Sequence, residues 1–158
     1  MITDDIDIFL QNTARNSALI GLDLGSKTIG VAFSDLSRSV ATPIKTIRRS
    51  KFGKDAQALL AVMSERNIGG IILGLPMNMD GSEGARCQST RAFARNFARL
   101  CEVPITFWDE RLSTVAAERA LLEADTSRKR RAEVIDHVAA AYILQGALDR
   151  IGFIQRKH

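Results

Sequence analysis

Three carboxylates occupy positions where the surrounding sequence is apolar. Asp23 interrupts the apolar run 18–24. Glu110 follows the apolar run 103–108, and Asp136 lies among small apolar residues of a helical pattern. Burying an unpaired charge is costly, so such groups are normally paired, protonated or bound to a metal ion. Three acids that face a common interior therefore predict a divalent-metal site that hydrolyses phosphodiesters.

Each acid also has a purely structural interpretation. Asp23 stands before a glycine and could cap a turn. Glu110 could pair with Arg111 or cap the helix that follows it, and Asp136 could be an acid favoured by a helix dipole. Together these interpretations require three coincidences, so a shared site is the preferred hypothesis.

The chemistry of such a cluster favours hard metal ions. Carboxylates that lie close together repel one another, and Mg²⁺ or Mn²⁺ relieves that repulsion through oxygen ligands. We expect Asp23, Glu110 and Asp136 to be both the catalytic residues and the metal ligands. We expect two ions about 4 Å apart, which would activate a water molecule and stabilise the leaving oxygen.

The secondary structure that positions these acids can be predicted from periodicity. Apolar runs predict five strands, at 18–24, 28–34, 41–47, 70–75 and 103–108. Helical spacing predicts four helices, at 54–66, 83–100, 113–123 and 132–149, with a polar loop at 125–130. The first two strands are too close for a parallel crossover and must form a hairpin. The fold class is α/β: a mixed five-stranded sheet, a three-strand antiparallel meander plus parallel strands, with helices on both faces.

This arrangement predicts where the acids point. Asp23 lies near the end of the first strand, and Glu110 ends the fifth, which we expect to be its neighbour. Asp136 shares a stripe with Ala140 and Ile143, so it should point toward the sheet.

Length and composition indicate one domain without membrane segments. We divide the 158 residues into an N-terminal extension, 1–16, and a single domain, 17–158. The extension is acidic and mixed, unlike a signal peptide, and the longest aliphatic run, 71–75, is too short to span a bilayer. Cys87 and Cys101 form no metal or disulfide pattern. We expect a cytoplasmic protein that does not bind membranes.

Cations near the acids suggest a nucleic-acid partner. The net charge of +4 and the pI near 9.4 suit a polyanion. Lys27 in the first hairpin and Arg111 beside Glu110 are expected to hold the scissile strand. Four consecutive cations in the predicted loop should grip phosphates beside the site; they are Arg128, Lys129, Arg130 and Arg131.

Four segments of the chain resemble the motifs of the YqgF family, also called RuvX. They are Gly21-Leu-Asp-Leu-Gly-Ser-Lys-Thr-Ile-Gly-Val-Ala-Phe-Ser-Asp35, Gly74-Leu-Pro-Met-Asn-Met-Asp-Gly-Ser-Glu-Gly84, Trp108-Asp-Glu-Arg-Leu-Ser-Thr114 and Asp136-His-Val-Ala-Ala-Ala-Tyr-Ile-Leu-Gln145. The resemblance implies a ribonuclease H-like fold related to Holliday-junction resolvases. It also implies a nuclease that matures the 5′ end of pre-16S ribosomal RNA.

The family's acidic site carries over onto Asp23, Glu110 and Asp136, the three acids already singled out. His137 lies outside the pattern and receives no role, and the segment 1–16 lies outside the resemblance. Alternatives stay open: a resolvase acting on branched DNA, a non-catalytic RNA-binding or ribosome-associated protein, and an ATP-binding protein with a phosphate hairpin. The sequence leaves three choices open: RNA or DNA as substrate, Mg²⁺ or Mn²⁺ as ion, and monomer or homodimer as oligomeric state.

Overall fold

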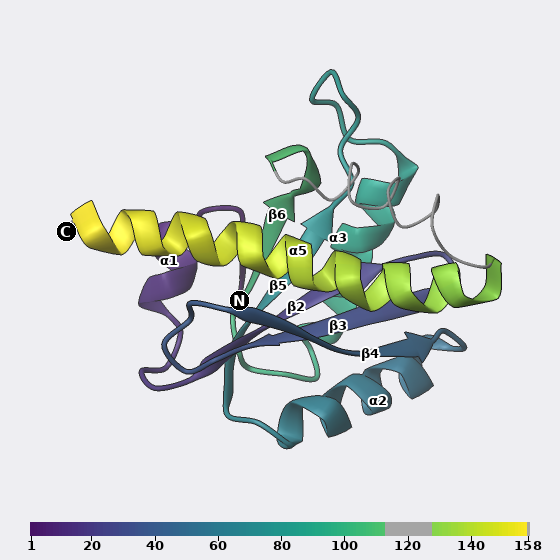
Figure 1. Ribbon diagram of the computed structural model, residues 1–158, viewed down its shortest axis with the longest axis horizontal. Helices are drawn as coiled ribbons and strands as arrows, with labels where there is room; N and C mark the ends of the chain where they lie inside the picture. Colours follow the sequence, from purple (N-terminus) through teal and green to yellow (C-terminus); the bar gives the residue numbers. More distant parts are fainter. Residues whose placement is uncertain (113–127, 158) are drawn as a thin grey trace.

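A mixed sheet of six strands is the frame of the protein (Figure 1). The computed structural model describes residues 1–112 and 128–157, with side chains for 1–112 and 138–156. The strands are β1 (Ile2–Thr3), β2 (Ala18–Leu24), β3 (Thr28–Ser34), β4 (Ala41–Arg48), β5 (Ile68–Leu75) and β6 (Ile105–Asp109). They lie in the order β1-β6-β5-β2-β3-β4. β2, β3 and β4 form the predicted antiparallel meander, and β5 and β6 continue the sheet in parallel with β2.

The N-terminal segment supplies a strand that the sequence did not reveal. The predicted count of five strands is corrected to six, because β1 pairs in parallel with β6 through Ile2 and Ile105. A strand of two residues has no alternation to detect. The short helix α1 (Ile6–Gln11) follows, and its Phe9 is fully buried. A Cβ at Gly70 of β5 would lie 2.5 Å from the Phe9 ring, so the N-terminal segment packs directly on the sheet.

The strands that carry Asp23 and Glu110 are not neighbours, contrary to the prediction. β5 lies between β2 and β6 and pairs in parallel with both. β5 therefore separates the two acids by one strand position. How near the two carboxylates can come therefore depends on which residue of β5 lies between them.

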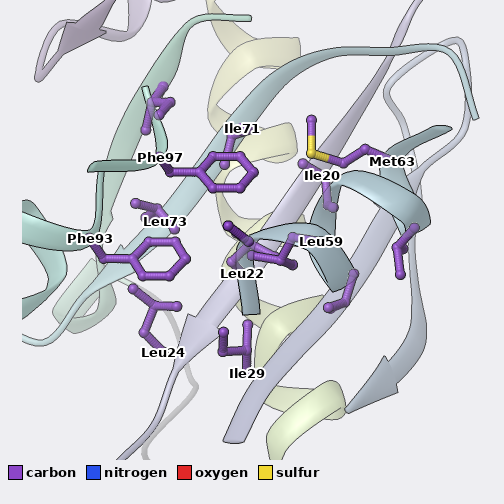
Figure 2. Packing of buried hydrophobic residues seen from close by; sticks show 14 of the residues in the cluster. Ile20, Leu22, Leu24, Ile29, Leu59, Met63, Ile71, Leu73, Phe93 and Phe97 are labelled. Atoms are coloured by element: carbon purple, nitrogen blue, oxygen red, sulfur yellow. The ribbon is translucent and has the colours of Figure 1, made fainter. Parts of the chain in front are cut away.

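Two helices cover one face of the sheet over a large apolar core. They are α2 (Phe52–Ser64) and α3 (Ala85–Phe97), close to their predicted ranges. Figure 2 shows Phe93 and Phe97 of α3 lying beside Leu73 and Ile71 of β5. The two phenylalanine rings stack with their centroids 5.8 Å apart. Leu59, on the buried face of α2, completes this layer.

One long helix, α5 (Arg128–Lys157), covers the opposite face (Figure 1). It begins before the predicted residue 132 and continues past the predicted end at 149, so Gly152 lies inside the helix. The expected loop 125–130 is therefore wrong from Arg128 onward, because consecutive Arg and Lys residues are good helix formers. The helix predicted at 113–123 lies outside the described residues. Within the described parts of the chain, no helix is both long and apolar enough to cross a membrane.

Glycines allow α5 to approach the sheet closely. A Cβ at Gly21 of β2 would lie 2.6 Å from Leu144 Cβ, and one at Gly74 of β5 would lie 2.5 Å from Ile143 Cδ1. Conversely, a Cβ at Gly146 of the helix would lie 2.9 Å from the Trp108 ring. These positions have no room for a side chain, so they set the distance between α5 and the strands.

We predict that Gly21→Ala lowers the free energy of unfolding by about 1–3 kcal/mol, the usual cost of overpacking a core. The new methyl group would collide with Leu144 Cβ and lie 3.1 Å from the Ala140 carbonyl oxygen. Urea unfolding followed by circular dichroism measures the change.

Gly53→Ala in α2 is the matched control, because a Cβ there meets no atom within 4 Å. Alanine favours helix over glycine by up to about 1 kcal/mol, so this variant should be as stable as the wild type or slightly more stable. Equal destabilisation by both substitutions would contradict the close-approach interpretation.

Candidate active site

Asp23 is a buried carboxylate between two glycine positions. It is 4% exposed and pairs with Gly30 of β3. The Leu22–Leu73 pair places Asp23 level with Gly74 of β5. Asp23 shares the sheet face of Gly21, which α5 contacts, because alternate residues of a strand point to the same face. Neither flanking strand therefore has a side chain at the level of this carboxylate.

The Glu110 side chain lies over one of those glycines, Gly74. It begins the 3₁₀ turn η1 (Glu110–Leu112) directly after β6 and is partly buried. Its Oε1 atom would lie 2.8 Å from a Cβ placed on Gly74. The Glu110 carboxylate thus occupies the space above β5 that any larger residue at 74 would fill. Gly74, level with Asp23 on the intervening strand, thus leaves room for the Glu110 carboxylate on the same face.

Asp136 lies on α5, one helical turn before Ala140. The Ala140 carbonyl lies over Gly21, two residues before Asp23 on β2. The backbone therefore places Asp136 on the helix that covers the Asp23 face, while its side chain lies outside the described residues. Among the described residues, no group of three His, Cys, Asp or Glu side chains is close enough to hold a metal ion.

Arg111 contacts a neighbouring acid and a loop. Its Nη2 donates to Asp109 Oδ2 at 2.8 Å, and its Nε donates to the same carboxylate at 3.1 Å. The hydrogen bond from Arg111 lowers the pKa of Asp109. The Nη1 atom donates to the Met79 carbonyl at 3.3 Å. Arg111 therefore joins the end of β6 to the loop that follows β5.

That loop, residues 76–84, has its own internal bonds and a second anchor. The Asn78 amide donates to the Ser82 carbonyl at 3.0 Å, and the Asp80 carboxylate accepts from the Ser82 amide at 2.9 Å. At its far end Glu83 pairs with Arg91 of α3 at 2.6 Å. Arg111 and Arg91 thus hold the loop at two points, Met79 and Glu83.

The predicted cation positions occur in two settings. Lys27 is exposed in the turn between β2 and β3, directly after the strand that carries Asp23. Arg128, Lys129, Arg130 and Arg131 form the start of α5, and their side chains lie outside the described residues.

Sequence reasoning missed Gly30 and Gly74 as functional positions. Both lie at the level of Asp23, one on each flanking strand. A glycine within a buried strand often marks a close approach of other groups. That signal was present in the sequence, but the register of the strands was needed to connect it with the acid.

Solved structures share this fold. Thermus thermophilus RuvC matches with a TM-score of 0.52 and 13% identity, over 85% of this chain and 96% of that one. A second structure, T. thermophilus RuvC in complex with a Holliday junction substrate, matches with a TM-score of 0.51 and 12% identity, over 86% and 96% of the two chains. The predicted ribonuclease H-like fold is confirmed.

Sequence comparisons define the family. The model of RuvX, described as Holliday junction resolvase, matches residues 17–150. A protein of Ruegeria pomeroyi named "Putative pre-16S rRNA nuclease" is 73% identical over 96% of this chain and 98% of its own length. Proteins of the same name from Paracoccus denitrificans and Rhodobacter capsulatus are 67% and 64% identical, over at least 99% of each chain.

This chain belongs to the RuvX family of nucleases, enzymes that hydrolyse phosphodiester bonds. The predicted family resemblance is confirmed. Nucleases of this family generally use divalent metal ions, and a buried carboxylate beside a second one is a donor set that fits such an ion.

We predict that Arg111→Lys loosens the loop 76–84 without unfolding the domain. Lysine cannot reproduce the forked contact with Asp109 and the Met79 carbonyl. Hydrogen–deuterium exchange should rise at Met79 to Ser82, while exchange in β2 and β5 stays unchanged. Arg86→Lys, an exposed residue of α3, is the control, and equal exchange in the two variants would contradict the anchoring role.

Proposed function

We propose that this chain is a metal-dependent endonuclease that matures the 5′ end of pre-16S ribosomal RNA, with Asp23, Glu110 and Asp136 as its catalytic acids. The observation that carries the site is the position of Glu110 Oε1 over Gly74, which lies level with the buried Asp23 on the neighbouring strand. The named activity of relatives that are 64–73% identical supports the substrate. A role in maturing ribosomal RNA supports a cytoplasmic location, which is part of the proposal.

The same three acids would hold Mg²⁺ or Mn²⁺, and we propose two ions. When bound, these ions would supply an activated water molecule and stabilise the leaving oxygen. Hard oxygen donors match both ions. Asp23 suits the central ligand position, because strand pairing on both sides fixes its backbone and burial limits its rotation.

The chain's own residues would position the substrate. α5 covers the Asp23 face and, with Gly21 and Gly74 beneath it, excludes bulk water from the inner side of the acids. Lys27 and the cations Arg128, Lys129, Arg130 and Arg131 would bind phosphates on either side of the scissile bond. Arg111 would hold its loop beside the scissile strand, and a phosphate there would compete with Asp109 for its guanidinium group.

A second candidate function is resolution of branched DNA. The family description names a Holliday junction resolvase, and RuvC, which shares the fold, has been solved in complex with a Holliday junction substrate. Resolvases act as dimers on junctions with two-fold symmetry, whereas cleavage of one RNA strand needs a single site. The oligomeric state on each substrate therefore separates the two functions.

We predict that Asp23→Asn reduces cleavage of a 16S precursor by more than about 100-fold, beyond the 10- to 100-fold typical of groups outside the ligand set. It should also abolish stabilisation by Mn²⁺, which at a hundred times the Kd would raise the wild-type unfolding free energy by about 2.7 kcal/mol. Single-turnover cleavage and thermal unfolding with and without Mn²⁺ measure the two effects.

Glu102→Gln, which neutralises an exposed carboxylate in the connection before β6, is the matched control and should behave as the wild type. Full cleavage by Asp23→Asn would rule out the metal site. A wild type that binds RNA without cleaving it in either ion would instead favour a non-catalytic accessory.

Direct comparison of substrates tests which function is the main one. We expect kcat/KM for a 16S precursor fragment to exceed that for a four-way DNA junction in both Mg²⁺ and Mn²⁺. Sedimentation with each substrate gives the number of protein chains bound. Faster cleavage of the junction by a two-chain complex would overturn the ribosomal RNA assignment.

A further inference from the structure

Cations are concentrated where β4 ends and α2 begins. Four of the seven residues 48–54 are Arg or Lys, against 22 of 158 in the whole chain. No Asp or Glu occurs from 36 to 54, so this positive charge is not offset along the sequence. A local excess of this size creates a positive surface potential that a polyanion would recognise.

Strand register places the first of these cations, Arg48, at the same end of the sheet as Asp23. Asp23 pairs with Gly30, and Gly30 pairs with Thr46 of β4. Thr28, two residues before Gly30, pairs with Arg48, two residues after Thr46, so Arg48 lies on the same sheet face as Asp23. At about 3.3 Å per residue and about 4.8 Å between strands, the two backbones are roughly 12 Å apart.

One cation of the group, Arg49, holds together the segments that carry the others. Arg49 Nη1 donates to the Gly25 carbonyl at 2.6 Å, and the Arg49 amide donates to the Lys27 carbonyl at 2.8 Å. Its Nε lies 4.0 Å from the carboxylate of Asp55, a buried residue of α2. Arg49 therefore ties the turn after Asp23 to the start of α2.

The remaining cations face solvent. Lys27, Arg48, Lys51 and Lys54 are all exposed, on the turn between β2 and β3, the end of β4 and the start of α2. The nearby acid, Asp55, is buried, accepts from the Ser50 amide at 2.9 Å and is paired with Arg49. The positive end of the α2 dipole adds to the same field.

We propose that Lys27, Arg48, Lys51 and Lys54 form a phosphate track that holds the nucleic acid on one side of the cleavage position. The proposal rests on the proposed nuclease function, and it adds Arg48, Lys51 and Lys54 to the substrate-binding surface. The occupant is a nucleic-acid backbone, because charge is complementary and the track begins at the turn directly after the strand of Asp23. Lysine and arginine side chains that contact phosphates do not contact the bases, so the track should bind independently of the nucleotide sequence.

The test compares the salt dependence of binding. All proteins carry Asp23→Asn so that the probe stays intact, and the probe is a labelled 16S precursor fragment that includes the 5′ leader. The triple variant Arg48→Ala, Lys51→Ala, Lys54→Ala should bind more weakly. Each phosphate contact contributes about 0.7–0.9 to the slope of log K against log salt. Loss of three contacts should therefore reduce the magnitude of that slope by about 2 to 3.

Two control variants separate a track from net charge and from misfolding. Arg15→Ala, Arg95→Ala, Arg99→Ala removes the same charge from exposed residues near the end of the sheet where β2 and β6 begin, and it should leave the slope close to the parent value. Arg48→Lys, Lys51→Arg, Lys54→Arg retains the charges and should retain the slope. Thermal unfolding of all variants should agree.

Each outcome decides the proposal. A reduced slope in the alanine triple alone supports the track. An unchanged slope in that triple, or an equal reduction in the distant control triple, overturns the track and leaves the nuclease function standing if the protein without Asp23→Asn cleaves the precursor. Failure of that protein to bind or cleave either the precursor or a four-way junction overturns both proposals.

Discussion

The close contact between α5 and the glycine positions of the sheet is the constraint on which the candidate site depends. Leu144 lies over Gly21 and Ile143 over Gly74, while Gly146 of the helix receives the Trp108 ring. Packing at these positions leaves no space for an added methyl group. The helix that carries Asp136 is therefore held against the strand that carries Asp23, so the position of the helix is fixed relative to that strand.

The same contact defines the surroundings of the buried Asp23 carboxylate. Asp23 would be costly in the middle of an apolar layer. It lies instead near the end of β2, with Gly30 and Gly74 on either side and Glu110 reaching over the latter. The large core on the opposite face, between the sheet and the helices α2 and α3, includes Leu22 and Leu24, the residues on either side of Asp23. The larger apolar core and the candidate acids thus lie on opposite faces of one sheet.

Much of the fold was predictable because its strands are dense apolar runs and its hairpins are short. The meander of β2, β3 and β4 follows directly from the connection of three residues after Leu24. The strand β1 was not predictable, since two residues show no period, and its place depends on pairing with β6. The start of α5 was mistaken for a loop because a run of charges resembles a solvated linker, although each residue favours a helix.

The sequence by itself determined the types of the three acids, the elements that carry them and the family to which the chain belongs. Only the tertiary structure decided that β5 separates the strands of Asp23 and Glu110 and that the Glu110 carboxylate lies over Gly74. It also decided that Arg48 shares a face with Asp23. The physical reason is that periodicity along a chain reports which side of its own element a residue faces. The order and register of strands depend on contacts between residues distant in sequence.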